Sequence, residues 1–331
     1  MVKINDNFRL FTIFFYIFIL SGCVASPKRP DWLTLQPKDY PEKQYVIAVG
    51  EADTQHLADS RALANLAKFF EVNIADVSSD FSQTSMLGSA NDKRFANEQK
   101  FTRQVNTETK QVLEGVRVVE RYKSQDGRYY SLAVLKKSPL ARRLRKSILA
   151  ADRNTNNALV YAQQQATNPL VALATLEKAR HYQLKREADN QRLSVLTGRG
   201  ITSKINSVTI QQQIQQGLSS LRFAVDADKK QDFDLLTSVV SGAGISISDQ
   251  TNYSVELNVD KAPVSYRQGW YWLRGSAELV IYHDDNGLAK KRWPFKVSSQ
   301  DESLLEQRLN DHLVKVLPAY FYSILTTEVN R

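Results

Sequence analysis

The chain has 331 residues, 42% of them hydrophobic and 24% charged, which is ordinary for a globular protein long enough for two folded domains. Its formal net charge of +9 favours a negatively charged partner surface. A single cysteine excludes a disulfide bridge within the chain and a metal site built from several cysteines. Each domain must therefore be stabilised by its own hydrophobic core.

The first residues of the chain have the pattern of a secretion signal over residues 1–22. A charged start is followed by eleven mostly apolar residues, 10–20, a run too short for a membrane span, which needs roughly twenty. Directly at its end stand four residues that resemble the lipobox of bacterial lipoproteins: Leu20, Ser21, Gly22 and Cys23. The resemblance implies cleavage before Cys23 and attachment of fatty acyl chains, such as palmitate, to its sulfur and its freed amine. An acylated Cys23 also excludes a thiol nucleophile.

The residues after Cys23 predict a short tether, residues 23–30, and a location. The seven residues Val24–Pro30 are rich in Pro, Ser and basic side chains and reach at most roughly 25 Å, so the folded part is expected close to the membrane. Val24 occupies the position where an aspartate retains lipoproteins at the inner membrane of enteric bacteria. Because Val24 and not an aspartate stands there, the protein is expected at the periplasmic face of the outer membrane. Secretion argues against a nucleic-acid partner.

Residues 31–137 are expected to form a first α+β domain. Alternation and apolar spacing predict a buried strand at residues 45–50, an amphipathic helix at 57–70 and a second strand at 72–77. A loop is expected at 84–97, followed by a hairpin of strands 116–122 and 129–135 with an Asp-Gly turn. Residues 101–113 fit either a strand or a helix.

Several segments of this region carry a family resemblance. They are Pro30-Asp31-Trp32, YVIAVGEA, the Ala-rich ADSRALANLAKFF, VNIADVSSDF and LEGVRVVERYKSQDGRYYSLAVL. Together they resemble the LPP-twenty (LPP20) lipoprotein family over about residues 30–137. The resemblance implies a small α+β domain found in envelope lipoproteins, some of them linked to outer-membrane integrity or flagellar structures. It implies no catalytic residues.

Residues 138–200 are expected to form a helical connector. Ser138-Pro139 predicts the start of one helix, a second is expected to end near Ala166, and Asn168-Pro169 predicts the start of a third. Six basic residues lie near its beginning: Lys136, Lys137, Arg142, Arg143, Arg145 and Lys146. They fit an amphipathic surface that contacts anionic lipid or glycan, or a solvated helix face whose leucines pack on protein.

Residues 201–331 are expected to form a second α+β domain, so the predicted architecture is two small α+β domains with antiparallel sheets and packed helices. In this domain Trp270 and Trp272 share one face of a predicted strand, flanked by Arg267 and Arg274. An exposed tryptophan pair stacks on a glycan or docks a partner protein. The alternative is that one strand face is core and the other is covered by the last helix.

The chemistry of the whole chain favours binding over catalysis. The histidines His56, His181, His283 and His312 are scattered, and no nucleophile elbow, phosphate loop, metal-ligand run or cofactor motif is present in the sequence. We therefore expect a non-enzymatic envelope lipoprotein that binds an envelope protein or peptidoglycan, or serves as a scaffold in peptidoglycan, outer-membrane or flagellar assembly. Self-association into a homo-oligomer is left open. The alternative function is a hydrolase acting on peptidoglycan or lipid.

Overall fold

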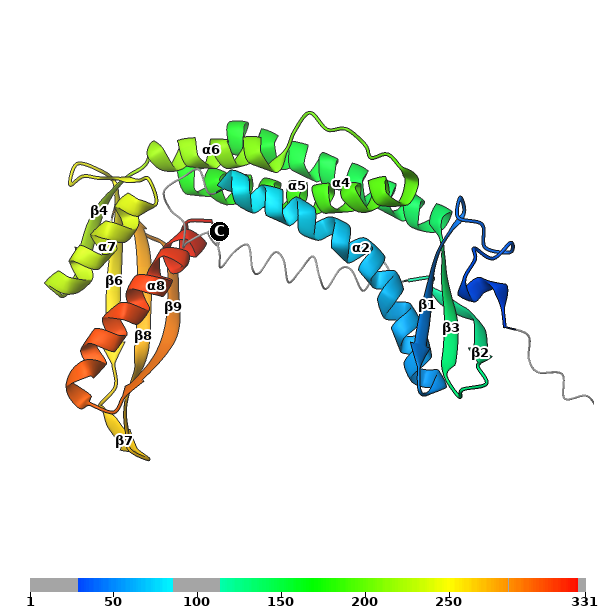
Figure 1. Cartoon of the computed structure of the whole chain (residues 1–331). Coiled ribbons are helices and arrows are strands. Elements are labelled where there is room, and N and C mark those ends of the chain that lie inside the picture. The colour runs from blue at the N-terminus through cyan, green and yellow to red at the C-terminus, as the bar shows by residue number, and fades with distance from the viewer. Residues whose placement is uncertain (1–28, 86–113, 285, 327–331) are drawn as a thin grey trace, which may run out of the picture. The chain divides into compact units, whose positions relative to one another are not determined.

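The structure is a computed structural model that describes residues 29–85, 114–284 and 286–326, with the backbone alone over residues 71–85 (Figure 1). The signal peptide, the lipobox with Cys23 and most of the tether lie outside the described residues, as do residues 101–113. Two compact units are present. One comprises the chain up to Leu66 together with Gly115–Lys136, and the other comprises Ala67–Glu114 and Lys137–Arg331.

The first unit contains a three-stranded antiparallel sheet in the order β1-β3-β2. Its strands are β1 Tyr45–Ala52, β2 Arg117–Lys123 and β3 Tyr129–Lys136. The predicted hairpin is confirmed, with Arg117 opposite Val134 and Lys123 opposite Tyr129. Gly127 in its turn has φ +85°, a left-handed conformation that glycine adopts without strain.

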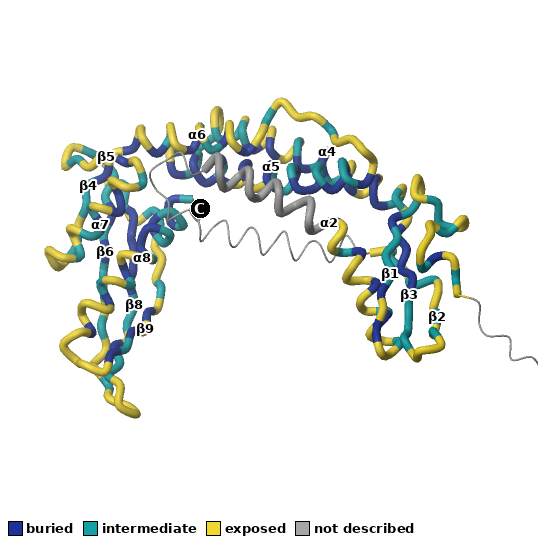
Figure 2. Tube along the Cα trace, in the orientation of Figure 1, coloured by how far each residue is buried: buried dark blue, intermediate teal, exposed yellow. Residues whose placement is uncertain are grey.

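The central strand β3 is buried on both faces, as Figure 2 shows. One face packs against Trp32, which the short turn η1 Asp31–Leu33 places beside Leu132 and Val134. The opposite face carries the buried Ser131, whose hydroxyl contacts helix α2 Gln55–Ser85. The continuous apolar pattern of β3 follows from this double cover.

Helix α2 is longer than predicted, and the strand predicted over residues 72–77 is wrong because these residues continue the helix. A six-residue alternation is too short to distinguish a strand from one side of a helix. The predicted loop from Thr84 likewise begins inside α2, and its remainder lies outside the described residues.

The second unit begins with a long helical hairpin, α4 Lys137–Gln164 and α5 Pro169–Thr197. The two helices predicted before Ala166 are therefore a single helix. The predicted break is confirmed: the Asn168 side chain accepts a hydrogen bond from the Val171 amide (3.0 Å) and caps α5. At the other end Gly198 closes α5 with φ 79°.

A mixed sheet in the order β5-β4-β6-β8-β7, with β9 paired to β8, follows this hairpin. Its strands are β4 Arg222–Ala227, β5 Ser246–Ile247, β6 Tyr253–Lys261, β7 Ser265–Arg267, β8 Trp270–His283 and β9 Asn286–Ser299. The α+β fold class is confirmed, but β4 pairs in parallel with β5 and β6, so this sheet is not antiparallel throughout as predicted. A helix joins β4 to β5, and such a crossover permits parallel pairing.

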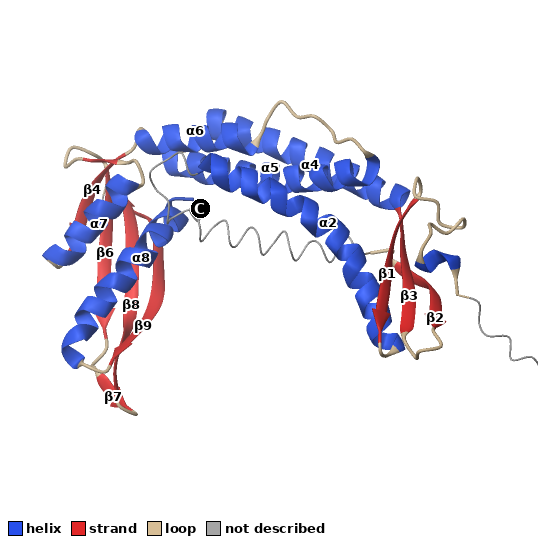
Figure 3. Ribbon diagram, in the orientation of Figure 1, coloured by secondary structure: helices blue, strands red, loops and turns tan. Residues whose placement is uncertain are grey.

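Helices cover one face of this sheet. The covering helices are α7 Lys230–Gly242 and α8 Leu305–Thr326, which lie in front of the strands in Figure 3. A further helix, α6 Ser207–Ser219, precedes β4 in the chain. One hydrophobic core runs from Leu173 and Ala179 of α5 through the sheet to Leu317 and Phe321 of α8. The helical hairpin and the sheet therefore form one unit. The predicted boundary near residue 137 lies beside the boundary between the units, and the one at residue 200 lies inside the second unit.

Candidate functional site

The basic residues near the start of α4 are mostly exposed. Lys136 ends β3 and is exposed, Lys137 opens α4 half-buried, and four exposed side chains follow: Arg142, Arg143, Arg145 and Lys146. Arg143 is engaged in an ion pair with Glu114, with Nη1 and Oε2 2.7 Å apart.

The apolar side of the same helix is not available to a lipid surface. Leu140, Leu144 and Ile148 are all buried. An amphipathic helix binds a bilayer through an exposed apolar face, and here that face is occupied inside the protein. Any contact of this helix with an anionic surface would therefore rest on its basic side chains alone.

Trp270 and Trp272 lie on the face of the second sheet that α7 and α8 do not cover. On β8 the alternate residues Leu273, Ala277 and Leu279 point into the core, so the two tryptophans point the other way. Trp272 is half-buried, and Lys296 Nζ lies over its ring, 4.0 Å from the centroid. Trp270 is exposed and stands opposite Arg267 of β7.

The rest of this open face carries paired charges. Glu278 accepts from Arg292 Nε (2.8 Å) and from Lys290 Nζ (3.0 Å), and Arg292 also pairs with Asp260 (3.0 Å). The hydrogen bonds from Arg292 and Lys290 lower the pKa of Glu278. Glu278 is therefore ionised at neutral pH and serves as an ion-pair partner of Arg292 and Lys290, not as a general acid.

The turn between β7 and β8 forms an aromatic projection, which we call the hairpin tip and define as residues 264–272. In Figure 1 it extends past the beginning of α8 at the end of the sheet. Sequence reasoning identified its two tryptophans but missed Tyr266, which is 62% exposed and lies 4.7 Å from Tyr271 between ring centroids. The signal that could have identified Tyr266 is the Gln268-Gly269 turn, which joins the short strand Ser265–Arg267 to the strand that carries the tryptophans.

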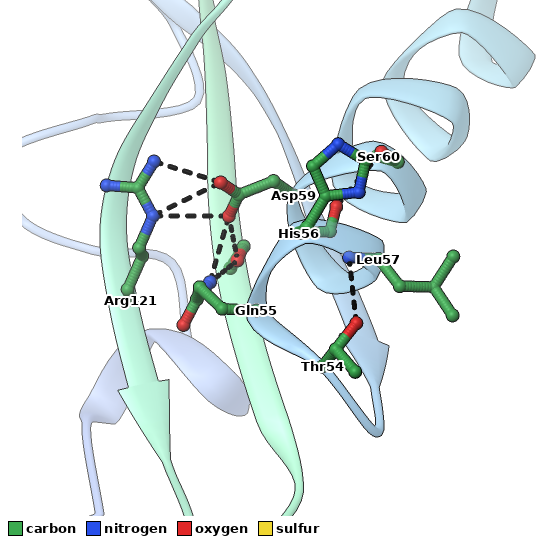
Figure 4. A network of polar contacts seen from close by, with 8 residues as sticks. Thr54, Gln55, His56, Leu57, Asp59, Ser60 and Arg121 are labelled. Atoms are coloured by element: carbon green, nitrogen blue, oxygen red, sulfur yellow. Dashed lines mark hydrogen bonds and ion pairs between the residues drawn. The ribbon is translucent and has the colours of Figure 1, made fainter.

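A polar network that the sequence did not reveal joins α2 to the sheet of the first unit (Figure 4). Asp59 accepts hydrogen bonds from Ser131 Oγ (2.5 Å), Gln55 Nε2 (2.9 Å) and Arg121 Nη2 (3.0 Å). Ser131 is fully buried, and the His56 ring is directed away from the carboxylate in Figure 4. The arrangement holds helix and sheet together and offers no accessible nucleophile.

Electrostatics in this network favour the ionised carboxylate. Partial burial by itself raises the pKa of Asp59, but the hydrogen bonds from Arg121, Ser131 and Gln55 outweigh it, so the net pKa is lowered. Asp59 is thus an anion that organises three donors from three elements.

Replacing Asp59 with Asn is expected to lower the unfolding free energy of the first unit by about 1 kcal/mol, because the negative charge that Arg121 pairs with is lost. The effect stays small because solvent already screens the exposed Arg121 guanidinium. Amide hydrogen exchange on β2 and β3 measures the change. The control is Asp53→Asn, which removes the carboxylate paired with Arg128 (3.0 Å) at a position with an 80% exposed side chain. Equal exchange in both variants would contradict the structural role of Asp59.

Within the described ranges, no group of three or more His, Cys, Asp or Glu side chains is placed to hold a metal ion. The four histidines lie in α2, α5, β8 and α8. Each helix in the described part of the chain is too short or too polar to cross a bilayer.

Comparison with known proteins gives one family and several distant structures. Residues 30–136 match the family described as LPP20 lipoprotein. No curated protein matches the chain. Among solved structures, a minor lipoprotein from Acinetobacter baumannii shares 12% identity, covering 33% of this chain and 89% of that chain with a TM-score of 0.25. The secreted protein HP1454 from Helicobacter pylori shares 13% identity, covering 83% of this chain and 98% of that chain with a TM-score of 0.41. A putative lipoprotein from Caulobacter crescentus shares 14% identity, covering 34% of this chain and 88% of that chain with a TM-score of 0.22.

The matched segment begins just before Trp32 and ends with the last residue of β3, so it includes all the strands of the first unit and the whole of α2. The family resemblance expected from the sequence is thereby confirmed. Over residues 30–136 the chain is therefore similar to the LPP20 lipoproteins.

Proposed function

We propose that this protein is a non-enzymatic binding or scaffold module, anchored through acylated Cys23 to the periplasmic face of the outer membrane. The observation that carries the proposal is the LPP20 match over residues 30–136, which follows a sequence resembling a lipobox after a tether of only a few residues. Val24 after the cysteine supports the outer membrane. The partner would be an envelope protein or peptidoglycan in envelope assembly, including flagellar assembly.

Tethering supplies the physical mechanism. A domain held at a membrane meets other membrane-bound partners at a high effective concentration, so individually weak contacts are sufficient. The exposed charges of α4 and the open, ion-paired face of the second sheet are surfaces of the kind that make such contacts. A catalytic pocket is not required for this mode of action.

The anchor is tested by labelling cells with a palmitate analogue. The wild-type protein is expected to carry the label and to fractionate with outer membranes, whereas Cys23→Ala is expected to lose the label because the sulfur that carries the acyl chains is gone. Ser26→Ala, a change in the tether that leaves the cysteine intact, serves as the control. An unlabelled wild-type protein would refute the anchor.

The role is tested by crosslinking envelopes and purifying the wild-type protein beside Cys23→Ala at equal abundance. We expect an envelope protein or peptidoglycan to be enriched with the wild type and depleted with the variant, because the variant loses its high local concentration. Recovery of no specific partner, or turnover of peptidoglycan or lipid by the purified protein, would overturn the binding role.

A further inference from the structure

We propose that the hairpin tip, residues 264–272, is a second membrane contact that enters the headgroup layer of an anionic bilayer. The inference takes a membrane location from the proposed function, but its test does not need the lipid anchor. The evidence is the exposure, shape and charge of the tip, which the family match does not cover.

Exposed apolar side chains are concentrated at this tip. Val264 is 41% exposed, Tyr266 62% and Trp270 40%. All three lie in one stretch of seven residues, in the pair of strands that extends beyond the sheet (Figure 1). Single exposed apolar residues are common on protein surfaces, but a cluster of this kind marks an interaction site.

Both faces of the hairpin carry aromatic rings. Arg267 pairs with Trp270 on one face, and Tyr266 pairs with Tyr271 on the other. A strand with one solvated face would be polar on that face, so the tip does not follow the alternation of the sheet behind it. A projection that is aromatic on both sides is suited to being surrounded, as it would be between lipid headgroups, where Trp and Tyr prefer to lie.

The turn makes the tip rigid. Gln268 has φ 53° and Gly269 has φ 79°, so both central residues of the two-residue loop are left-handed, as in the tightest hairpins. A preformed projection loses little conformational entropy when it enters a surface.

Charge selects an anionic surface. From Ala262 to Ala277 the chain has two basic residues, Arg267 and Arg274, and no acidic one. Within the described part of the chain, neither arginine forms an ion pair with a carboxylate, whereas Glu278 behind the tip is paired with Lys290 and Arg292. The acidic residues after β9, Asp301 and Glu302, belong to the turn η2 Glu302–Leu304 and its cap, where Asp301 accepts from the Ser303 amide (2.9 Å). Free arginines beside aromatic rings favour anionic headgroups.

The same geometry argues against a glycan as the main ligand. A sugar stacks on an open ring face, but Lys296 occupies a face of the Trp272 ring at 4.0 Å from the centroid. Trp270 and Trp272 therefore do not form a two-ring platform with free faces. A projecting tip also lacks the concave surface that encloses most small ligands.

The test uses the purified chain of residues 24–331, which lacks the acylated cysteine but contains all described residues. It is sedimented with vesicles of phosphatidylethanolamine and phosphatidylglycerol, and separately with vesicles of phosphatidylcholine alone. We expect stronger binding to the anionic vesicles and an about tenfold or greater loss in the double variant Tyr266→Ser/Trp270→Ser, since two exposed rings no longer leave water. Phe233→Ser, which removes a 39% exposed ring from α7, is the matched control and should bind like the wild type.

Charge and fluorescence are tested separately. Arg267→Gln/Arg274→Gln should abolish the preference for anionic vesicles, and Trp270 emission should shift to the blue on binding, a shift absent from Trp270→Phe. Equal vesicle binding by wild type and the double variant, with both folded by circular dichroism, would overturn the proposal. Binding to isolated peptidoglycan but not to vesicles would do so too. Either result leaves the labelling test of Cys23 unaffected, so the two proposals fail separately.

Discussion

Replacing Gly50 with Val is expected to unfold the first unit at room temperature. A Cβ atom at this position would lie 2.2 Å from the Ala58 carbonyl oxygen and 2.2 Å from the Ala62 nitrogen, both backbone atoms of α2. The glycine thus allows helix and strand to approach more closely than any side chain permits. Overpacking a core usually costs about 1–3 kcal/mol, and here the loss should exceed about 3 kcal/mol because backbone cannot turn aside as a side chain does.

Amide hydrogen exchange on β1 and β3 of the full chain measures this effect without interference from the second unit. The control is Gly287→Ala, where the added Cβ would meet only the Tyr282 ring at 4.0 Å, an ordinary contact. Its exchange pattern should match the wild type. Native protection of β1 and β3 in Gly50→Val would show that the close helix–strand approach is not needed for this domain.

Replacing Glu177 with Ala should destabilise the second unit by about 3–5 kcal/mol, the usual cost of removing one partner of a buried ion pair. Glu177 is 4% exposed and Arg180 is 8% exposed. The carboxylate accepts from Arg180 Nη2 (2.6 Å) and Nε (2.9 Å), and from the Tyr322 hydroxyl (3.0 Å). The group therefore links α5 to α8, and its loss leaves the Arg180 charge buried without this carboxylate. Urea unfolding of the full chain measures the change.

The same residue gives the second unit a specific acid sensitivity. Burial raises the pKa of Glu177, but the hydrogen bonds and charge of Arg180, with His181 and Tyr322, outweigh it, so the pKa in the folded state lies below its ordinary 4.5. The unfolded chain then binds a proton more readily than the folded one. The resulting stability is fully present above about pH 4.5 and is lost as pH falls through the folded pKa.

Glu177→Gln keeps the volume and an acceptor oxygen but removes this titration. Its unfolding free energy should be lower than that of the wild type at pH 7, and the difference should narrow toward pH 3. Acid unfolding curves that stay parallel for the two proteins would contradict the role of the carboxylate as a charged partner of Arg180.

Glu177 also starts a pattern that the sequence analysis overlooked. Buried polar side chains recur every three residues along α5: Glu177, Arg180, Gln183, Arg186, Asp189 and Arg192. Several bond to α4, where Ser147 donates to Asp189 (2.6 Å) and Asp152 accepts from Arg186 (3.2 Å). On sequence alone such residues fit a solvated helix face, because burial depends on what packs against them.

Local chemistry was sufficient where structure depends on neighbouring residues. Alternation and the Asp-Gly turn predicted the hairpin of β2 and β3, and Asn168-Pro169 predicted the start of α5. The α+β class followed from the same short-range patterns. These features involve bonds between residues a few positions apart, so no distant partner was needed to predict them.

Features that depend on residues far apart in the sequence could not be predicted from local patterns. The parallel pairing of β4 with β6 and the network of Asp59 with Arg121 and Ser131 belong to this group. The hydrogen bond from Tyr322 to Glu177, which joins residues 145 positions apart, is of the same kind. A periodic sequence pattern indicates that one side of a helix or strand is apolar. Which element covers that side, and whether a charged side chain is exposed or buried, depends on the packing of the whole unit.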